Sequence, residues 1–386
     1  MVRTVLKRDI VILGGGLNGA ALALALSHGA YEVTLVEAQP PLAPSEAWDA
    51  RIYAYSPGNV DWLRDLGGWT DTLRQQPVHA MRVHGDAEGR LTFDALETGL
   101  PALASIAENG RVQWQIWQAL QARGVQVVNE RPVGVAWDTR GSAHTLHFSE
   151  AVPALQARLL VAADGAQSWL RQQAGIGLAV EDYHQSGIVA NFACERSHRG
   201  IAWQWFRRDG ILAYLPLPGR HLSIVWSTPS EAVAARLAQS PEALAHEVAA
   251  AGGYVLGDLR LITAAQAFPL KRRLAHEWVR PGLVLLGDAA HTVHPLAGQG
   301  VNLGFRDSRL LAEMLAQGGD PGEIGRLQSY ALRRREDVLG MQAVTGHLKR
   351  GFYELGGPFG AWRNSGMTLV DTLGPLKQAL MRHAVQ

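Results

Sequence analysis

The sequence predicts an α/β fold in which a Rossmann-like nucleotide-binding domain carries an inserted antiparallel sheet and ends in helices. Three observations predict this class. Residues 9–36 read as a strand–turn–helix–strand unit of about the usual 30 residues. Residues 183–226 form short alternating segments separated by turn signals, as in an antiparallel sheet. An apolar strand and a second glycine-rich turn follow near residue 287, and the patterns beyond residue 306 are helical.

Composition limits the kinds of site that the chain supports. Its 386 residues are 47% hydrophobic, which is enough for a large core and about two domains. The formal net charge of +1 gives no electrostatic reason to expect nucleic acid as a partner. The single cysteine, Cys194, excludes a disulfide framework and a cysteine-based metal site. No acidic or cysteine ligand accompanies His291 and His294, so we expect no metal. The single cysteine makes a reducing compartment the simpler interpretation, and we expect a cytoplasmic location.

The first unit has the pattern of a dinucleotide-binding turn. In Gly14-x-Gly16-x-x-Gly19, the first glycine permits the tight turn, the second lets the backbone approach a pyrophosphate, and the third lets helix and sheet pack closely. Leu17 and Asn18 begin the helix, whose N-terminus favours phosphate. The same apolar run resembles a signal peptide, but the glycines and Asn18 interrupt it where the turn needs them.

Glu37 closes the second strand of this unit, 18 residues past Gly19. A carboxylate there would accept a hydrogen bond from an adenosine ribose. Arg51 lies in the following loop and suits a phosphate or a flat ring, although a solvated surface pair with Asp49 is the plainer interpretation. Asp164 ends another apolar strand, where it acts either as a cofactor contact or as a helix cap.

A second ligand-binding turn stands about 270 residues after the first. Asp288 follows Gly287 at the end of an apolar strand, where it could accept a ribityl hydroxyl or cap a helix. Two such turns so far apart indicate one extended dinucleotide with a large ring system, and we expect non-covalent FAD. The chain would then have a Rossmann-like FAD-binding domain.

The loop after Asp288 is glycine-rich for a physical reason. A helix N-terminus can stabilise negative charge on the N1–C2=O edge of a reduced flavin, and glycine lets the backbone reach that edge. We therefore expect a catalytic flavin-edge loop that acts through its main chain rather than through a nucleophilic side chain. Its residues are Pro295, Gly298, Gln299 and Gly300, with Val301 and Asn302 as further cofactor contacts.

These segments predict a discontinuous domain organisation. Residues 1–75, 100–180 and 278–345 would form the FAD-binding domain. Residues 76–99 and 181–277 would form a substrate-binding sheet domain, and residues 346–386 a C-terminal helical segment.

The motifs together resemble those of the class A FAD-dependent aromatic hydroxylases, the relatives of para-hydroxybenzoate hydroxylase. The run His-Pro-Leu-Ala-Gly-Gln-Gly-Val-Asn-Leu-Gly-Phe-Arg-Asp at residues 294–307 is similar to the signature of the ubiquinone-biosynthesis hydroxylase branch. The resemblance covers nearly the whole chain and implies that Arg111 and Gln113, at the start of the third helix, contact the flavin. The chain departs from the pattern at Asn18, at the bulky residues 52–55 and at Trp205.

The resemblance implies the activity as well. Reduced FAD would react with oxygen at C4a, and the resulting hydroperoxide would hydroxylate the ring of a (poly)prenylated phenol in ubiquinone biosynthesis. Electrons would come from NAD(P)H or from a redox partner protein. We expect peripheral association with the inner face of a membrane, contacts with other quinone-biosynthesis proteins and a homo-oligomer. Aromatic residues of the inserted sheet would line the substrate pocket, namely Trp203, Trp205, Tyr214 and Trp226.

Two other flavin-dependent activities do not match the sequence, and two alternatives stay open. A flavin-dependent halogenase needs a lysine between the first glycine loop and the sheet, and none occurs from residue 8 to residue 270. The Gly-Gln-Gly-x-Asn run disfavours a prenyl-chain reductase. A hydroxylase of another aromatic metabolite, or a non-catalytic flavin-fold scaffold of the quinone-biosynthesis assembly, remains the alternative.

Overall fold

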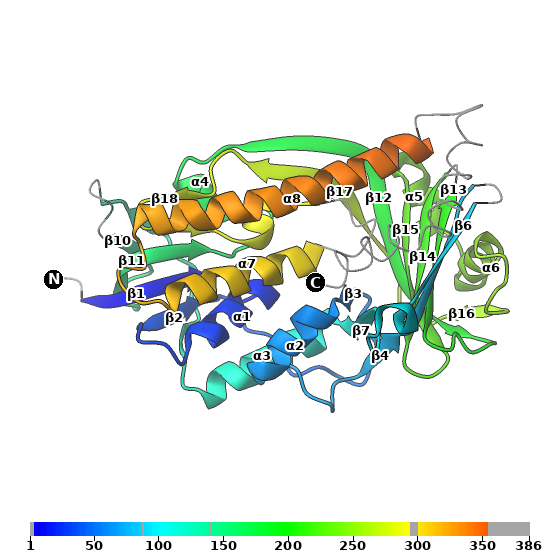
Figure 1. The fold of residues 1–386 in the computed structure, drawn as a ribbon, viewed down its shortest axis with the longest axis horizontal. Coiled ribbons are helices and arrows are strands. Elements are labelled where there is room, and N and C mark those ends of the chain that lie inside the picture. The colour runs from blue at the N-terminus through cyan, green and yellow to red at the C-terminus, as the bar shows by residue number, and fades with distance from the viewer. Residues whose placement is uncertain are drawn as a thin grey trace.

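The computed structural model describes residues 4–86, 89–138, 141, 143–207, 209–293 and 300–353, without the side chains of residues 98 and 343–353. Two large sheets lie toward opposite ends of an elongated molecule, and a three-stranded sheet lies between them (Figure 1). Long helix α8 (Ile324–Tyr353) runs along one side of the molecule from the first large sheet toward the second (Figure 1).

The first sheet is mostly parallel and has the strand order β18-β19-β11-β1-β2-β8; β10 pairs with β11, and β9 pairs with β10. Its strands are β1 (Val5–Leu13), β2 (Val33–Val36), β8 (Gln126–Val128), β9 (Gly134–Ala136), β10 (His144–His147), β11 (Ala154–Ala162), β18 (Val279–Arg280) and β19 (Leu283–Leu285). The helices of this part are α1 (Leu17–Leu26), α2 (Pro57–Asp65), α3 (Asn109–Ala122), α4 (Trp169–Gln173), α7 (Gly300–Leu315) and α8, with the 3-10 turn η2 (Gly287–Ala289).

The central strand of this sheet is buried on both faces. Strand β1 pairs in parallel with β11 on one side and with β2 on the other. Ile10, Val11 and Ile12 have no exposed surface, because two hydrophobic clusters cover the two faces of the sheet. A run of apolar residues without alternation is what a parallel strand buried on both faces requires. The predicted β-α-β opening and the α/β fold class are confirmed.

The second sheet is mainly antiparallel, in the order β20-β17-β12-β15-β14-β13-β5-β6, with β16 beside β12. Its strands are β5 (Ala80–His84), β6 (Arg90–Asp94), β12 (Leu178–Cys194), β13 (Ile201–Arg207), β14 (Gly210–Leu217), β15 (His221–Pro229), β16 (Leu259–Leu261), β17 (Gln266–Ala275) and β20 (His291–Thr292). The 3-10 turn η1 (Ala95–Thr98) and helices α5 (Ser230–Leu237) and α6 (Pro241–Ala251) accompany it.

A small antiparallel sheet of β3 (Ile52–Tyr55), β7 (Ala104–Glu108) and β4 (Gln75–Val78) joins the two large sheets. The boundary expected between residues 75 and 76 falls inside β4. Strand β12 already begins at Leu178, and β20 pairs with β17 of the second sheet. Helix α8 continues beyond residue 345 to Tyr353, whereas residues 354–386 of the expected C-terminal helical segment lie outside the described residues.

The four aromatic residues expected in the substrate pocket lie elsewhere. Trp203, Tyr214 and Trp226 belong to the hydrophobic cluster that includes Leu244 and Val248 of α6, and Trp205 packs at its edge. The strand register places these side chains on one face of the sheet, and the sequence did not show that α6 covers that face. They are core residues of the sheet.

Their individual contacts agree with this placement in the sheet core. The Tyr214 hydroxyl donates to the Val248 carbonyl at 2.6 Å. The Arg236 guanidinium lies 4.0 Å from the centre of the Trp226 ring. The Trp205 ring stacks on His84 with a centroid distance of 5.8 Å.

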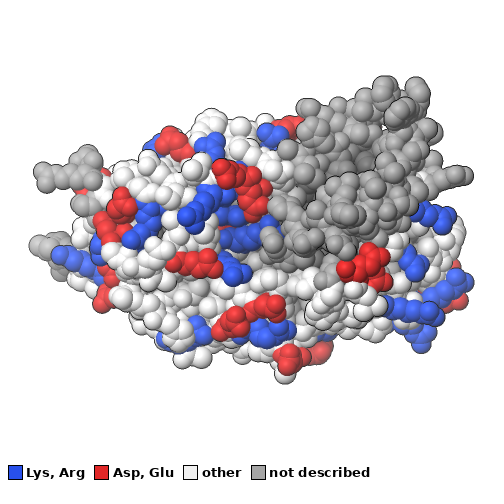
Figure 2. All heavy atoms as spheres, viewed as in Figure 1, with Lys and Arg blue, Asp and Glu red and all other residues white. Residues whose placement is uncertain are grey.

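Within the described residues, no helix combines the length and the apolar character needed to cross a bilayer. Basic and acidic side chains are interspersed on the face that Figure 2 shows, and neither sign forms a continuous band there.

We predict that Tyr214→Phe destabilises the fold without changing flavin binding. The substitution removes one hydrogen bond to α6, which costs about 1 kcal/mol of the free energy of unfolding, and leaves the pocket untouched. Urea unfolding and FAD titration measure the two quantities. Tyr254→Phe is the matched control, because Tyr254 is 39% exposed. Removing the Tyr254 hydroxyl should cost less than about 0.5 kcal/mol of the free energy of unfolding. Unchanged stability together with a large rise in KM for a phenolic substrate would place Tyr214 in the substrate site.

Candidate functional site

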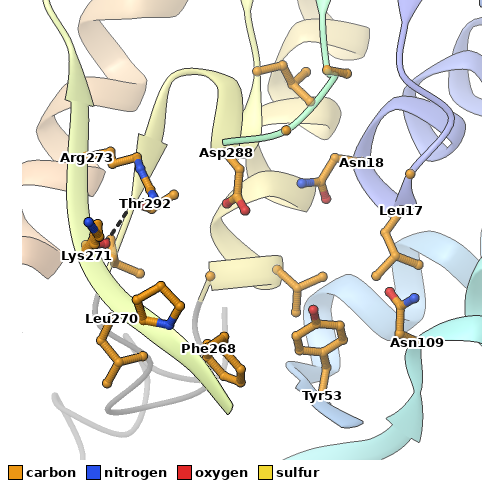
Figure 3. A pocket seen from close by; sticks show the side chains of 18 residues that line it. Leu17, Asn18, Tyr53, Asn109, Phe268, Leu270, Lys271, Arg273, Asp288 and Thr292 are labelled. Carbon is orange, nitrogen blue, oxygen red and sulfur yellow. Dashed lines mark hydrogen bonds between the residues drawn. The ribbon is translucent and has the colours of Figure 1, made fainter. Parts of the chain in front are cut away.

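A pocket of about 350 Å³ opens between the first glycine loop, the start of α7 and strand β17 (Figure 3). Segments from the beginning, middle and end of the chain meet in it. The residues that line it are Gly16, Leu17, Asn18, Tyr53, Asn109, Ala163, Gly165, Phe268, Pro269, Leu270, Lys271, Arg273, Leu286, Asp288, Thr292, Val293, Gly300 and Val301.

The glycine loop has the geometry that its sequence predicts. Gly14 has a φ of +107°, and a Cβ there would lie 2.4 Å from the Ala163 carbonyl oxygen. A Cβ on Gly19 would lie 2.0 Å from the carbonyl oxygen of Gly14, so α1 could not pack against β1. Gly16, in contrast, would meet none of the described atoms within 4 Å. It is the glycine that a ligand can approach.

Gly15, which lies between the first two glycines of the motif, has a role that the motif did not indicate. The Gly15 N–H donates to Glu37 Oε2 at 2.7 Å. The Gly15 carbonyl accepts from Trp117 Nε1 at 2.8 Å and from Gln113 Nε2 at 2.9 Å. A Cβ on Gly15 would lie 2.5 Å from the Trp117 ring. Gln113 and Glu37 therefore lie at the glycine loop, and α3 holds the loop in place.

The two arginines expected at the cofactor do not line this pocket. Arg111 Nε lies 3.0 Å from Glu108 Oε2, and Arg111 Nη2 donates to the Ser45 carbonyl at 2.6 Å. Arg51 is 65% exposed in its side chain, with Nε 3.9 Å from Asp49 Oδ1. Arg111 lies in the first turn of α3, and the Arg51 carbonyl accepts from the N–H of the pocket residue Asn109 at 2.9 Å.

Asp164 caps a helix, and its second carboxylate oxygen is buried beside pocket residues. Its Oδ2 accepts from the Leu170 N–H at 3.0 Å, which caps α4. Its Oδ1 is buried without a hydrogen-bond partner among the described residues, and its neighbours Ala163 and Gly165 line the pocket. Burial raises the pKa of this carboxyl, although the hydrogen bonds from Ser168 and the helix oppose the rise.

Asp288 projects into the pocket from the turn η2 (Figure 3). The residue is surrounded by protein, yet its side chain is exposed to the pocket itself. Burial raises the pKa of the carboxyl, and His291 and Arg273 oppose this rise. Gly287 takes a φ of +58°, and a Cβ there would lie 2.6 Å from Asn18 Nδ2. The turn thus requires glycine before the carboxylate.

A buried carboxylate on α7 holds this turn. Asp307 Oδ2 accepts from the Gly287 N–H at 2.9 Å and lies 2.7 Å from His291 Nε2. Arg334 Nε donates to Asp307 Oδ1 at 2.6 Å, and Arg334 Nη1 donates to Asp337 at 2.7 Å. Burial alone would raise the pKa of Asp307, but His291 and Arg334 hold the pKa below its usual value. An ionised carboxylate only accepts, so His291 Nε2 carries the proton of that bond.

Asn302 joins α7 to the small sheet. Its Oδ1 accepts from the Ser56 N–H at 2.9 Å and from Asn59 Nδ2 at 3.0 Å, and its Nδ2 donates to the Ala54 carbonyl at 2.8 Å. Its side-chain amide is therefore already bonded on both atoms and is structural, and only its main chain can face a cofactor. Gly300 and Val301 do line the pocket, whereas Pro295, Gly298 and Gln299 lie outside the described residues.

Several pocket residues carried no sequence signal. Tyr53 directs its ring into the pocket, and Phe268 lies near it (Figure 3). Asn109, Lys271 and Arg273 also line it. The bulk of Tyr53 relative to the family pattern was the one available clue. The cationic pair could not be assigned, because only the fold brings β17 to the glycine loop.

The pocket fits a dinucleotide on the evidence of its own atoms. The Asn18 Oδ1 and Asp164 Oδ1 atoms are buried acceptors without partners in the described part of the chain, and unpaired buried acceptors are rare unless a ligand or water satisfies them. The hydroxyls of a ribityl chain are donors of the kind these acceptors and Asp288 lack. Gly16 and the α1 N-terminus add the donors that a pyrophosphate needs.

A fold with this glycine loop, carboxylate turn and helix start defines a nucleotide-binding flavoprotein. A family model described as "FAD binding domain" matches residues 7–344, and the chain belongs to this family of FAD-binding proteins. The expectations of FAD and of a monooxygenase of this family are confirmed.

The relatives of the chain have related activities. It is 35% identical to the 3-demethoxyubiquinol 3-hydroxylase of Escherichia coli (strain K12), over 98% of both chains. It is 30% identical to the human mitochondrial ubiquinone biosynthesis monooxygenase COQ6, over 97% of this chain and 92% of that one. The crystal structure of p-nitrophenol 4-monooxygenase PnpA from Pseudomonas putida DLL-E4 has the same fold, with a TM-score of 0.79 over 99% of each chain at 18% identity.

We predict that Asp307→Asn lowers the free energy of unfolding at pH 7 by about 3–5 kcal/mol, because Arg334 loses its buried counterion. The folded pKa of Asp307 lies below the unfolded value of about 3.9. Its stabilisation is therefore present above that value and disappears as the pH falls through the folded pKa. The difference between wild type and variant should shrink in acid. Urea unfolding from pH 7 to pH 3 measures it.

Arg309→Gln provides the control for this prediction. It breaks an exposed pair with Glu313 on the same helix and should cost less than about 0.5 kcal/mol. Equal losses for the two variants would contradict the role given to Asp307.

Proposed function

We propose that the chain hydroxylates the aromatic ring of a prenylated phenol in ubiquinone biosynthesis. The single observation that carries this proposal is the 35% identity to a 3-demethoxyubiquinol 3-hydroxylase over nearly the full length of both chains. The FAD pocket, with an apolar wall beside its polar end, supports it.

The bound flavin supplies the oxygen chemistry: once reduced, it activates O2 and delivers one oxygen atom to the ring. The chain's own residues bind and orient. Asp288 and Asn18 would accept hydrogen bonds from the ribityl hydroxyls, and the N–H groups at the start of α7, at Gly300 to Asn302, would donate to the ring edge. Pro295, Gly298 and Gln299, outside the described residues, remain proposed members of this flavin-edge loop.

The apolar part of the pocket would receive the substrate ring. Phe268 is 42% exposed, and Leu270, Val301 and Tyr53 line the same space. Burial raises the pKa of Tyr53, and Asp288 adds to this rise, so its hydroxyl stays protonated and can donate a hydrogen bond. These residues replace the four sheet aromatics as the proposed substrate contacts.

Partners complete the proposal. The electron donor is NAD(P)H or a redox protein, since the sequence has one dinucleotide-binding pattern and FAD occupies it. A prenylated substrate resides in a bilayer, which motivates peripheral association with the membrane surface. Liposome flotation tests that association. Quinone-biosynthesis proteins and a second copy of the chain are further proposed partners.

We predict that a prenylated phenol stimulates oxygen uptake by the purified, FAD-loaded protein and leaves with one added hydroxyl group. An oxygen electrode measures the uptake with NADH, with NADPH and with a reconstituted redox partner, and mass spectrometry identifies the product. Phe268→Ala should raise KM more than it lowers kcat, because it removes apolar contact with the ring.

The alternatives have distinct outcomes. Turnover of unprenylated phenols alone would indicate another aromatic metabolite. A flavin that is bound and reducible but never coupled to product, with every donor and phenol tested, would indicate a scaffold and contradict the proposal.

A further inference from the structure

Strand β17 brings two cations to the pocket. Lys271 and Arg273 are two residues apart and share one face of the strand, and both line the pocket (Figure 3). Arg272, between them, lies on the opposite face and pairs with Glu181 at 3.4 Å.

The two pocket cations differ in their partners. Lys271 Nζ lies 2.9 Å from Asp182 Oδ2, so its charge is already compensated. The Arg273 guanidinium makes no hydrogen bond or ion pair with any of the residues that the structure describes, although the Arg273 backbone pairs with its neighbouring strands. Its charge nevertheless acts on the pocket, because it opposes the rise in the pKa of Asp288. A guanidinium carries five N–H donors and keeps its charge at all accessible pH values. The Arg273 guanidinium therefore has donors and a charge available for an anionic group of a ligand.

The order of residues along the pocket indicates which anionic group this is. Leu17, next to the phosphate-binding Gly16, lies at one side, Asp288 lies between, and Arg273 lies at the other side (Figure 3). A dinucleotide whose pyrophosphate meets the α1 N-terminus and whose ribityl chain meets Asp288 continues toward Arg273 with its ring. The phosphates are then held at the end of the pocket opposite Arg273, so the ring is the part of the cofactor near the guanidinium.

The ring becomes an anion when it is reduced. A hydride donor gives it two electrons and one proton, and the ring then carries one negative charge. A positive charge nearby stabilises the reduced form more than the neutral oxidised form, and the protein matrix screens that charge less than water does. The consequence is a higher reduction potential.

We propose that Arg273 is the side chain that stabilises the anionic reduced flavin ring in this pocket. The proposal rests on FAD binding alone and is independent of the substrate. Arg273 therefore tunes when the flavin accepts electrons, and it adds a full charge to the partial charge of the α7 N-terminus.

The test is a redox titration of the full-length, FAD-loaded protein with a reference dye, together with FAD titration of the oxidised apoprotein. In Arg273→Gln, reduced FAD should lose about tenfold more affinity than oxidised FAD. For a two-electron couple this ratio equals a potential more negative by about 30 mV. Arg273→Lys keeps the charge and should restore most of the shift.

Lys271→Gln is the matched control. It removes a cation from the same strand face, but one that Asp182 already compensates, so the potential should move much less. The assignment is overturned if Arg273→Gln keeps the wild-type potential, or if Lys271→Gln shifts it equally. It is also overturned if Arg273→Gln weakens both redox forms equally, which would indicate a phosphate contact or a structural role. If Arg273→Gln does not fold, Arg273→Met is measured in its place. The assignment is overturned if Arg273→Met binds reduced and oxidised FAD with the same ratio of affinities as the wild type.

Discussion

The buried carboxylate of Asp307 is the constraint on which the cofactor site depends. It has no exposed surface, and it receives the Gly287 N–H, the His291 imidazole and the Arg334 guanidinium. Removing such a charge from water is costly, and only complete pairing offsets the cost. The carboxylate therefore fixes the turn, α7 and α8 relative to one another. Asp288 reaches the pocket because the residue before it is held in this way.

The pocket is a joint product of both large sheets. Strand β17 belongs to the antiparallel sheet, yet β20, which follows the cofactor turn, pairs with it through Thr292 and His291. His291 thus contacts Asp307 on one side and extends the second sheet on the other. A single hydrogen-bonded segment links the carboxylate that would hold the ribityl chain to the strand that carries Arg273 and Phe268. The residues proposed to hold the ribityl chain and the ring therefore belong to segments that β20 joins.

Local chemistry made part of this site predictable from the sequence. Gly14, Gly16 and Gly19 were assignable because each glycine answers a backbone requirement within one turn. Asp288 was assignable because it follows an apolar strand at a glycine. The opening β-α-β unit was assignable because its apolar period is local.

The remainder depends on contacts between distant segments. The sequence assigned Trp203 and Tyr214 to the inserted sheet, but their shared face and its cover by α6 are tertiary properties. Asn302 has the sequence context of a cofactor contact, while its amide in fact joins α7 to Ser56 and Asn59. Arg334 meets Asp307 across 27 positions of sequence, and Arg273 carried no motif. The contacts of these residues follow from the assembled sheets and cannot be inferred from the local sequence.

The most direct measurement is the FAD affinity and stoichiometry of Asp288→Ala, read from the visible absorption of the purified protein and from titration of its apoprotein. Glu277→Ala, which changes a carboxylate outside the pocket, is its control. We expect wild type and control to bind one FAD per chain and Asp288→Ala to bind at least about tenfold more weakly, as the loss of hydrogen bonds to a charged group requires. A folded Asp288→Ala protein with one FAD and wild-type affinity would contradict the account.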